Sequence, residues 1–214
     1  GGGFGPSDLA TYFGGLGLDT PDVQAVSVDG ARNTPGKDPQ GADGEVLLDI
    51  EVAGALAPKA AIRVYFAPNT DAGFIDAVSQ AAHASPTPTA MSISWGQSED
   101  GWTGQARSAL DAAMADAVAL GCTVTAASGD DGSVDRTTDG KAHCDFPASS
   151  PHALGCGGTT LHANGQTGAV TSETVWNNGS GNGATGGGVS DAFALPTWQQ
   201  QAELIELLNR AVEM

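Results

Sequence analysis

The sequence predicts an α/β fold in which a parallel sheet has helices on both faces. Short apolar segments, such as residues 61–67 and 122–127, alternate along the chain with longer helix-like segments. Strands buried on both faces are continuous apolar runs, and their alternation with helices is typical of a parallel sheet. With 214 residues, of which 40% are hydrophobic and 15% charged, the chain is long and apolar enough to bury a core.

The helices are predicted from apolar periodicity between capping and breaking residues. Ser7 is an N-cap candidate for the first helix, Pro58 stops the second and Gly121 ends the last. The predicted helices span residues 7–16, 44–57, 71–83 and 103–120. The predicted strands span residues 23–28, 61–67, 91–95, 122–127 and 153–157, and the predicted loops span residues 30–43 and 177–188.

Two polar segments lie at the carboxyl ends of predicted strands. Ser94, Trp95 and Gly96 lie at the end of one strand, and Ser128, Gly129 and Asp130 directly follow another. Right-handed crossovers place such strand ends along one edge of the sheet, and ligands of open α/β sheets bind beyond that edge. The sequence therefore predicts a ligand-binding or catalytic site built from these two segments.

The chain is strongly acidic, with 25 Asp and Glu residues against 8 Lys and Arg residues, a formal net charge of −17 and a sequence pI near 4.1. Such a surface repels phosphates, which argues against nucleic-acid binding. Near its pI the protein loses most of its self-repulsion, which suits an acidic medium; an ordinary soluble acidic protein is an equally good explanation of the charge. No apolar run approaches the length of a membrane span, so no membrane partner is expected.

Neither the cysteines nor the histidines are spaced for metal binding. The cysteines are Cys122, Cys144 and Cys156, and the histidines are His83, His143, His152 and His162. The sequence leaves the oxidation state of the cysteines open. The histidines have no obvious partner acid, so they are interpreted as ordinary surface or loop residues.

Glu45 and Asp49 lie four residues apart on a predicted helix, so both project from one face of it. If the pair is buried, one pKa rises and the two carboxyl groups can share a proton. Such a pair acts as a general base at acid pH, where histidine is already protonated. The alternative is a solvent-facing acidic edge. The apolar residues all round this helix favour burial.

Asp130, in the sequence AASGDDG, points a carboxyl group toward the predicted crevice at the strand ends. When protonated, it would donate a hydrogen bond to a developing oxyanion. The alternative is a residue that stabilises an Asx turn. Ser94, Ser128 and Ser133 are nucleophile candidates by residue type alone, because none lies in a Gly-x-Ser-x-Gly elbow.

Beyond these patterns, eight ordered segments between residues 1 and 200 resemble the sedolisin family of serine-carboxyl peptidases, and within it the kumamolisin-like acid endopeptidases. They are GADGEVLLDIEVAGALAPKA, YFAPNTDAGF, SISWG, ASGDDGS, CDFPASSP, CGGTTL, ETVWN and TGGGVS. The resemblance implies a subtilisin-like three-layer fold, a parallel sheet with helices on both faces. It also implies a secreted, acid-active endopeptidase with a Ser-Glu-Asp triad.

The resemblance implies catalytic roles for three carboxyl groups. Glu45 matches the general base that takes the proton of the serine hydroxyl, and Asp49 matches the acid that orients it. Asp130 matches the aspartic acid that replaces the oxyanion-hole amide.

The resemblance also implies a binding site for a peptide or protein substrate. Trp95 matches the aromatic residue beside the acid network, and the backbone from Ser94 to Gly96 is expected to pair with extended substrate. Asp145, in CDFP, matches a position that shapes the pocket for the side chain before the scissile bond.

The chain departs from the family pattern at both ends, so the expected fold is incomplete there. The family's serine lies in a Gly-Thr-Ser motif well after TGGGVS, and its calcium site lies later still; neither is recognisable here. Residues 1–200 are therefore expected to form a partial peptidase domain, and residues 201–214 an amphipathic helix unlike the family. A strand with a supporting acid, which the family has before the triple glycine, is also expected to be missing, leaving an exposed sheet edge.

Two hypotheses remain open at this point. The first is a peptidase fragment that is inactive alone and has the missing C-terminal part of the domain as its partner. The second is a non-catalytic remnant or an engineered interaction module built on the same scaffold.

Overall fold

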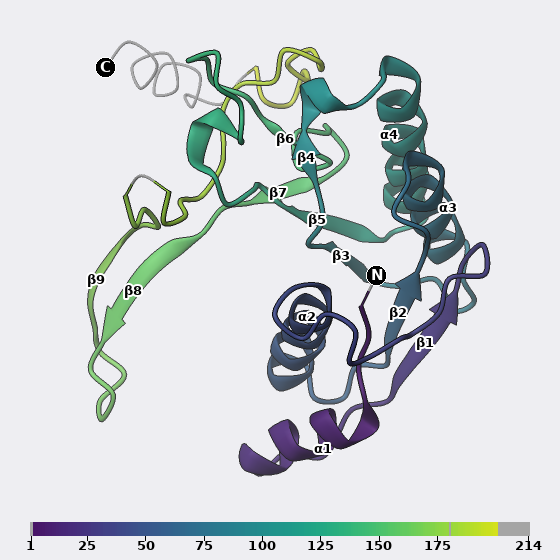
Figure 1. The fold of residues 1–214 in the computed structure, drawn as a ribbon, viewed down its shortest axis with the longest axis vertical. Helices are drawn as coiled ribbons and strands as arrows, with labels where there is room; N and C mark the ends of the chain where they lie inside the picture. The colour runs from purple at the N-terminus through teal and green to yellow at the C-terminus, as the bar shows by residue number, and fades with distance from the viewer. Residues whose placement is uncertain (1, 180, 201–214) are drawn as a thin grey trace.

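The computed structural model describes residues 2–179 and 181–200, and its architecture is α/β, as predicted (Figure 1). Four α-helices are described: α1 (Pro6–Gly15), α2 (Ala42–Leu56), α3 (Asp71–Ala82) and α4 (Gly104–Ala119). The strands are β1 (Val23–Ser27), β2 (Ile62–Phe66), β3 (Ala90–Ile93), β4 (Gln97–Ser98), β5 (Thr123–Ala127), β6 (Asp145–Phe146), β7 (Leu154–Cys156), β8 (Thr159–Ala163) and β9 (Val170–Val175). Two short 3-10 helices, η1 (Glu99–Gly101) and η2 (Gly132–Val134), complete the described elements.

The parallel strands form two sheets instead of one. In one sheet β1 pairs with β2, and in the other the order is β3-β5-β7; all of these pairings are parallel. Within residues 2–179 and 181–200, no strand pairing joins β2 to β3. The prediction of parallel strands is confirmed, but the division between the two sheets depends on non-local pairing that local sequence patterns do not encode.

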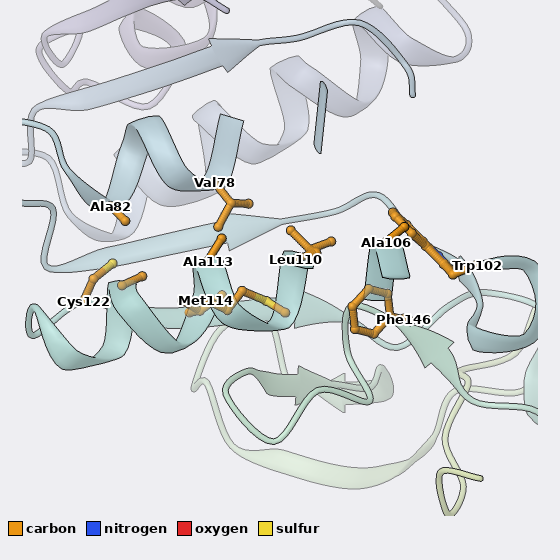
Figure 2. Packing of buried hydrophobic residues seen from close by; sticks show 11 residues of the cluster. Val78, Ala82, Trp102, Ala106, Leu110, Ala113, Met114, Cys122 and Phe146 are labelled. Carbon is orange, nitrogen blue, oxygen red and sulfur yellow. The ribbon is translucent and has the colours of Figure 1, made fainter. Parts of the chain in front are cut away.

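The larger core lies around α3, α4 and β5 (Figure 2). Leu110 and Met114 of α4 have no exposed surface and lie in one cluster with Val78 of α3. Trp102 and Phe146 extend this core toward β4 and β6, with ring centroids 5.2 Å apart in an edge-to-face arrangement. This core supports the strand ends at which Ser94 and Asp130 lie.

A second, separate core packs α1 and α2 against β1 and β2. Phe13 of α1 is fully buried, and Val46 and Ile50 of α2 are 8% and 2% exposed. Burial all round α2, expected from its composition, is wrong. One face carries Leu48, Val52 and Leu56, which are 54%, 48% and 83% exposed, because no described element covers it.

The predicted helices and the main strands agree with the structure to within about two residues at each end, which is normal for such boundaries. The antiparallel β8–β9 hairpin was not predicted and extends away from the body of the molecule (Figure 1). The helix predicted within residues 201–214 lies outside the described residues. None of the described helices combines the length and hydrophobicity needed to cross a bilayer.

Candidate functional site

Helix α2 presents Glu45 and Asp49 toward the carboxyl ends of β3 and β5. Burial is the largest influence on both groups and raises the pKa of each above its ordinary value. The negative charges of Asp49 and then Asp130 raise the pKa of Glu45 further. The structure therefore brings together three carboxyl groups that the sequence singled out separately, and both helix residues hold their protons more tightly than a free acid does.

Ser94 connects this helix to the larger core. Its hydroxyl donates a hydrogen bond to Oδ1 of Asp49 over 2.7 Å, although the two residues are 45 positions apart. Because the hydrogen bond favours the ionised carboxylate, it opposes the burial that raises the pKa of Asp49. Ser94 is therefore a direct partner of the acid pair. Trp95, the next residue, is 40% exposed beside it.

Replacing Ser94 by Ala should raise the pKa of Asp49 further, because burial then acts on the carboxyl group without the opposing hydrogen bond. The measurement is an NMR titration of the Asp49 carboxyl carbon, assigned with Asp49→Asn. Ser92→Ala, at an exposed position of β3 two residues before Ser94, is the matched control and should leave the titration unchanged. An Asp49 pKa that stays the same or falls in Ser94→Ala would contradict this account.

A cavity of about 320 Å³ opens at the ends of β3 and β5. Ser94 and Gly96 line it from the segment after β3, and Asp130 lines it from the segment after β5. Gln97, Ser98, Gly101, Ala127, Gly129, Asp131, Asp135, Arg136 and Asp145 complete the lining. This acidic cavity lies where the sequence predicted a site, beyond the carboxyl ends of parallel strands.

Asp145 is the most perturbed acid of the acidic cavity. It is 7% exposed, and its Oδ1 atom is buried without a hydrogen-bond partner among the described residues. Burial, followed by the charge of Asp135, raises the pKa of Asp145 to about 7. Gly96 passes so close that a Cβ atom there would overlap the Asp145 carboxylate, so the position requires glycine.

Asp135 is a cavity residue that the sequence did not indicate. It is 8% exposed, has a left-handed backbone with φ of 42°, and also has a buried carboxylate oxygen without a partner among the described residues. Burial raises its pKa, and neighbouring Arg136 opposes that rise. Its loop position offered no periodicity from which to find it. The cavity thus holds two buried carboxyl groups, and each has one oxygen without a hydrogen-bond partner among the described residues.

The segment from Ala184 to Gly188 is hydrogen-bonded to the strand-end segment that carries Asp130. The N–H of Gly186 donates to Gly129 O, and the N–H of Ala184 donates to Asp130 O, over 2.9 and 2.8 Å. Glu99, only 2% exposed, anchors the residues that follow by accepting hydrogen bonds from Ser190 Oγ and the N–H of Asp191. Sequence analysis missed Glu99, because its partners lie some ninety positions away.

The interpretation of the histidines as residues without partner acids is wrong for two of them. His143 contacts Asp100 and Asp139, and His152 contacts Asp111 over 2.9 Å. His143 lies about forty positions from Asp100 along the chain, and His152 lies about as far from Asp111. Local sequence patterns therefore could not indicate either pair. The three cysteines carry free thiols, a point that the sequence left open.

Among residues 2–179 and 181–200, no group of three or more His, Cys, Asp or Glu side chains is arranged to hold a metal ion. The calcium that the family resemblance implies for the complete domain is therefore assigned to no described residue, and the expectation that its site lies outside this chain stays a prediction.

Comparison with known proteins identifies the family. A scan against models of protein families finds no match. Among curated proteins, kumamolisin of Bacillus sp. strain MN-32 is 56% identical over 206 residues, which cover 95% of this chain and 37% of kumamolisin. Sedolisin of Pseudomonas sp. strain 101 is 31% identical over 207 residues, which cover 90% of this chain and 35% of sedolisin.

The solved structures agree. Pseudomonas sedolisin, a serine-carboxyl proteinase complexed with two molecules of pseudo-iodotyrostatin, matches with a TM-score of 0.78 and 29% identity over 91% of this chain and 56% of that one. The fold and the carboxyl-rich site therefore define a member of a peptidase family. The chain belongs to the sedolisin family of serine-carboxyl peptidases, and within that family it is kumamolisin-like. It spans a little over a third of the length of the curated relatives that it matches.

Proposed function

We propose that this chain supplies the carboxyl groups of the catalytic centre of an acid-active, serine-type endopeptidase. The observation that carries the proposal is the convergence of Glu45, Asp49 and Asp130, from two elements far apart in the sequence, beside one cavity. Glu45 acts as the general base for a serine hydroxyl, Asp49 orients it and Asp130 stabilises the oxyanion of the tetrahedral intermediate. Family membership supports this assignment.

Because the pKa values of Glu45 and Asp49 are raised, the acid pair can exchange a proton at acid pH, where histidine would already be protonated. The low content of Lys and Arg, 8 residues against 25 acids, supports work in an acidic medium outside the cell. The substrate is an extended polypeptide. Ser94, Trp95 and Gly96 lie along its path, and the 320 Å³ cavity beside Asp145 is of a size to receive one side chain.

Ser94 does not serve as the nucleophile in this proposal, because its hydroxyl is already donated to Asp49 and not to Glu45. The nucleophile is the serine of the Gly-Thr-Ser motif that the family resemblance implies. The chain alone is therefore expected to be inactive and to gain activity when a polypeptide carrying that motif completes the domain.

The test is incubation with a denatured protein substrate at about pH 4. The chain is tested first by itself. It is then tested after co-refolding with a fragment of kumamolisin that begins after the segment of kumamolisin corresponding to TGGGVS. New amino termini are counted by mass spectrometry. We expect cleavage only in the completed protein and a loss of about a hundredfold or more when Glu45 is replaced by Gln. Cleavage that survives Glu45→Gln, or that the chain performs alone, would overturn the proposed roles.

A further inference from the structure

His143 lies between two carboxylates that come from different segments of the chain. Its Nδ1 is 2.5 Å from Oδ2 of Asp100 in η1, and its Nε2 is 2.9 Å from Oδ1 of Asp139 in the segment between β5 and β6. The histidine side chain is only 11% exposed, whereas the two carboxylate side chains are 61% and 47% exposed. The ring is therefore enclosed and fixed in place, and both of its nitrogen atoms are engaged.

The number of protons on the ring decides how many of these contacts are favourable. A neutral imidazole has one N–H and one lone pair, and the lone pair cannot donate to a carboxylate. Only the imidazolium cation has two N–H groups and can donate to Asp100 and Asp139 together. The observed arrangement is thus that of a charged histidine bridging two anions.

The two ends of this bridge belong to two neighbouring walls of the acidic cavity, and the antiparallel pairing of β4 with β6 joins these walls directly beside the bridge. Asp100 belongs to η1, which with β4 supplies the lining residues Gln97, Ser98 and Gly101. Asp139 and His143 belong to the segment 128–144 between β5 and β6, which supplies the lining residues Asp130, Asp131, Asp135 and Arg136. The N–H of His143 also donates to Ser133 O over 2.7 Å, so the ring's position is transmitted to the backbone of that wall.

We propose that His143, Asp100 and Asp139 form an acid clasp, which adds a charged link between the two walls of the acidic cavity at acid pH and releases one of its contacts near neutral pH. The clasp depends on geometry and proton count alone, so it stands independently of the proposed peptidase activity.

The titrations of its members set the working range of the acid clasp. Hydrogen bonds first with Asp139 and then with Asp100 raise the pKa of His143 above its ordinary 6.5. A histidine whose pKa is raised by folding stabilises the folded state. This stabilisation is complete below pH 6.5 and is lost as the pH rises through the folded-state pKa. The hydrogen bond with His143 lowers the pKa of Asp139 below 3.8, so its contribution is complete above pH 3.8 and is lost as the pH falls through the lowered value. The clasp is therefore complete between these limits.

Other charges around the ring do not change this conclusion. Asp135, on the same wall, is a further carboxyl group that interacts electrostatically with His143. Lys141 acts on Asp139, to whose Oδ1 its own N–H donates over 3.0 Å. The surroundings of His143 are thus mainly negative, which favours the imidazolium form.

The test combines an NMR titration of the histidine ring protons with hydrogen exchange of the backbone amides of residues 133–144. In the unmodified chain, His143 should titrate above pH 6.5, and Asp139→Asn should move its midpoint back toward that value. The protection factor of the His143 amide should fall about threefold to fivefold between about pH 5.5 and pH 8, the range expected for one surface ion pair. The amide of Cys122, which donates to Ala117 O in the larger core, is the internal reference.

His143→Gln provides the matched variant, because glutamine keeps one donating group and one accepting group but cannot become charged. Its protection factors should be lower at pH 5.5 and nearly independent of pH. The proposal is overturned if His143 titrates at or below 6.5 in the unmodified chain. It is also overturned if the pH-dependent fall in protection is the same in the unmodified chain and in His143→Gln.

Discussion

Replacing Asp145 by Asn should remove about 4 kcal/mol of the pH dependence of stability between pH 4 and pH 7. Asp145 has a pKa near 7 in the folded protein and an ordinary value of 3.8. Between these values the unfolded chain has lost the proton that the folded chain keeps, so the free energy of unfolding falls as pH rises. Each pH unit in that interval costs about 1.4 kcal/mol, and the interval is about three units wide.

The measurement is urea-induced unfolding at a series of pH values between about 4 and 8, for the original chain and for Asp145→Asn. The variant should keep a smaller decline with pH, because Glu45, Asp49 and Asp135 also have raised pKa values. Asp116→Asn, which removes an exposed carboxylate on α4, is the control for loss of one charge and should leave the profile nearly unchanged. Parallel profiles for the original chain and Asp145→Asn would refute the burial argument.

Replacing Phe146 by Ala should lower the free energy of unfolding by about 3–5 kcal/mol. The ring is fully buried, lies edge-to-face against Trp102 and stacks on Phe193 at a centroid distance of 5.7 Å. Alanine would leave a cavity where three aromatic rings now meet, and the neighbouring residue Asp145 would lose one of its supports. Few substitutions outside the larger core should cost as much.

Urea unfolding followed by far-ultraviolet circular dichroism measures the loss. Phe146→Leu is the matched variant, since it retains most of the buried volume and should cost less than half as much as the alanine variant. An alanine variant that loses less than about 1 kcal/mol would show that the ring is not a principal contact of the core.

The parts of the site that follow local rules were predictable from the sequence. The spacing of Glu45 and Asp49 fixes them on one helix face, and the apolar strand before Asp130 fixes that residue at a strand end. The partners of these residues were not predictable, because Ser94 reaches Asp49 across 45 positions. Only the folded chain brings such groups together.

Two other features show why local patterns failed elsewhere. The β8–β9 hairpin has no buried face to impose a regular apolar alternation, since Leu161, Val170 and Val175 are all more than half exposed. The Asn164-Gly165 dipeptide between its strands is a turn signal that could have revealed it. Asp135 owes its role to a left-handed backbone in a loop, a conformation that its residue type only weakly indicates.

The division of the parallel strands into two sheets has a consequence for the site itself. Glu45 and Asp49 belong to the half of the molecule built on β1 and β2, whereas Ser94 and Asp130 belong to the half built on β3 and β5. The Ser94–Asp49 hydrogen bond therefore joins two bodies that have separate cores. A small displacement of one body against the other would break this bond without unfolding either core, and the proton affinity of Asp49 would report that displacement directly.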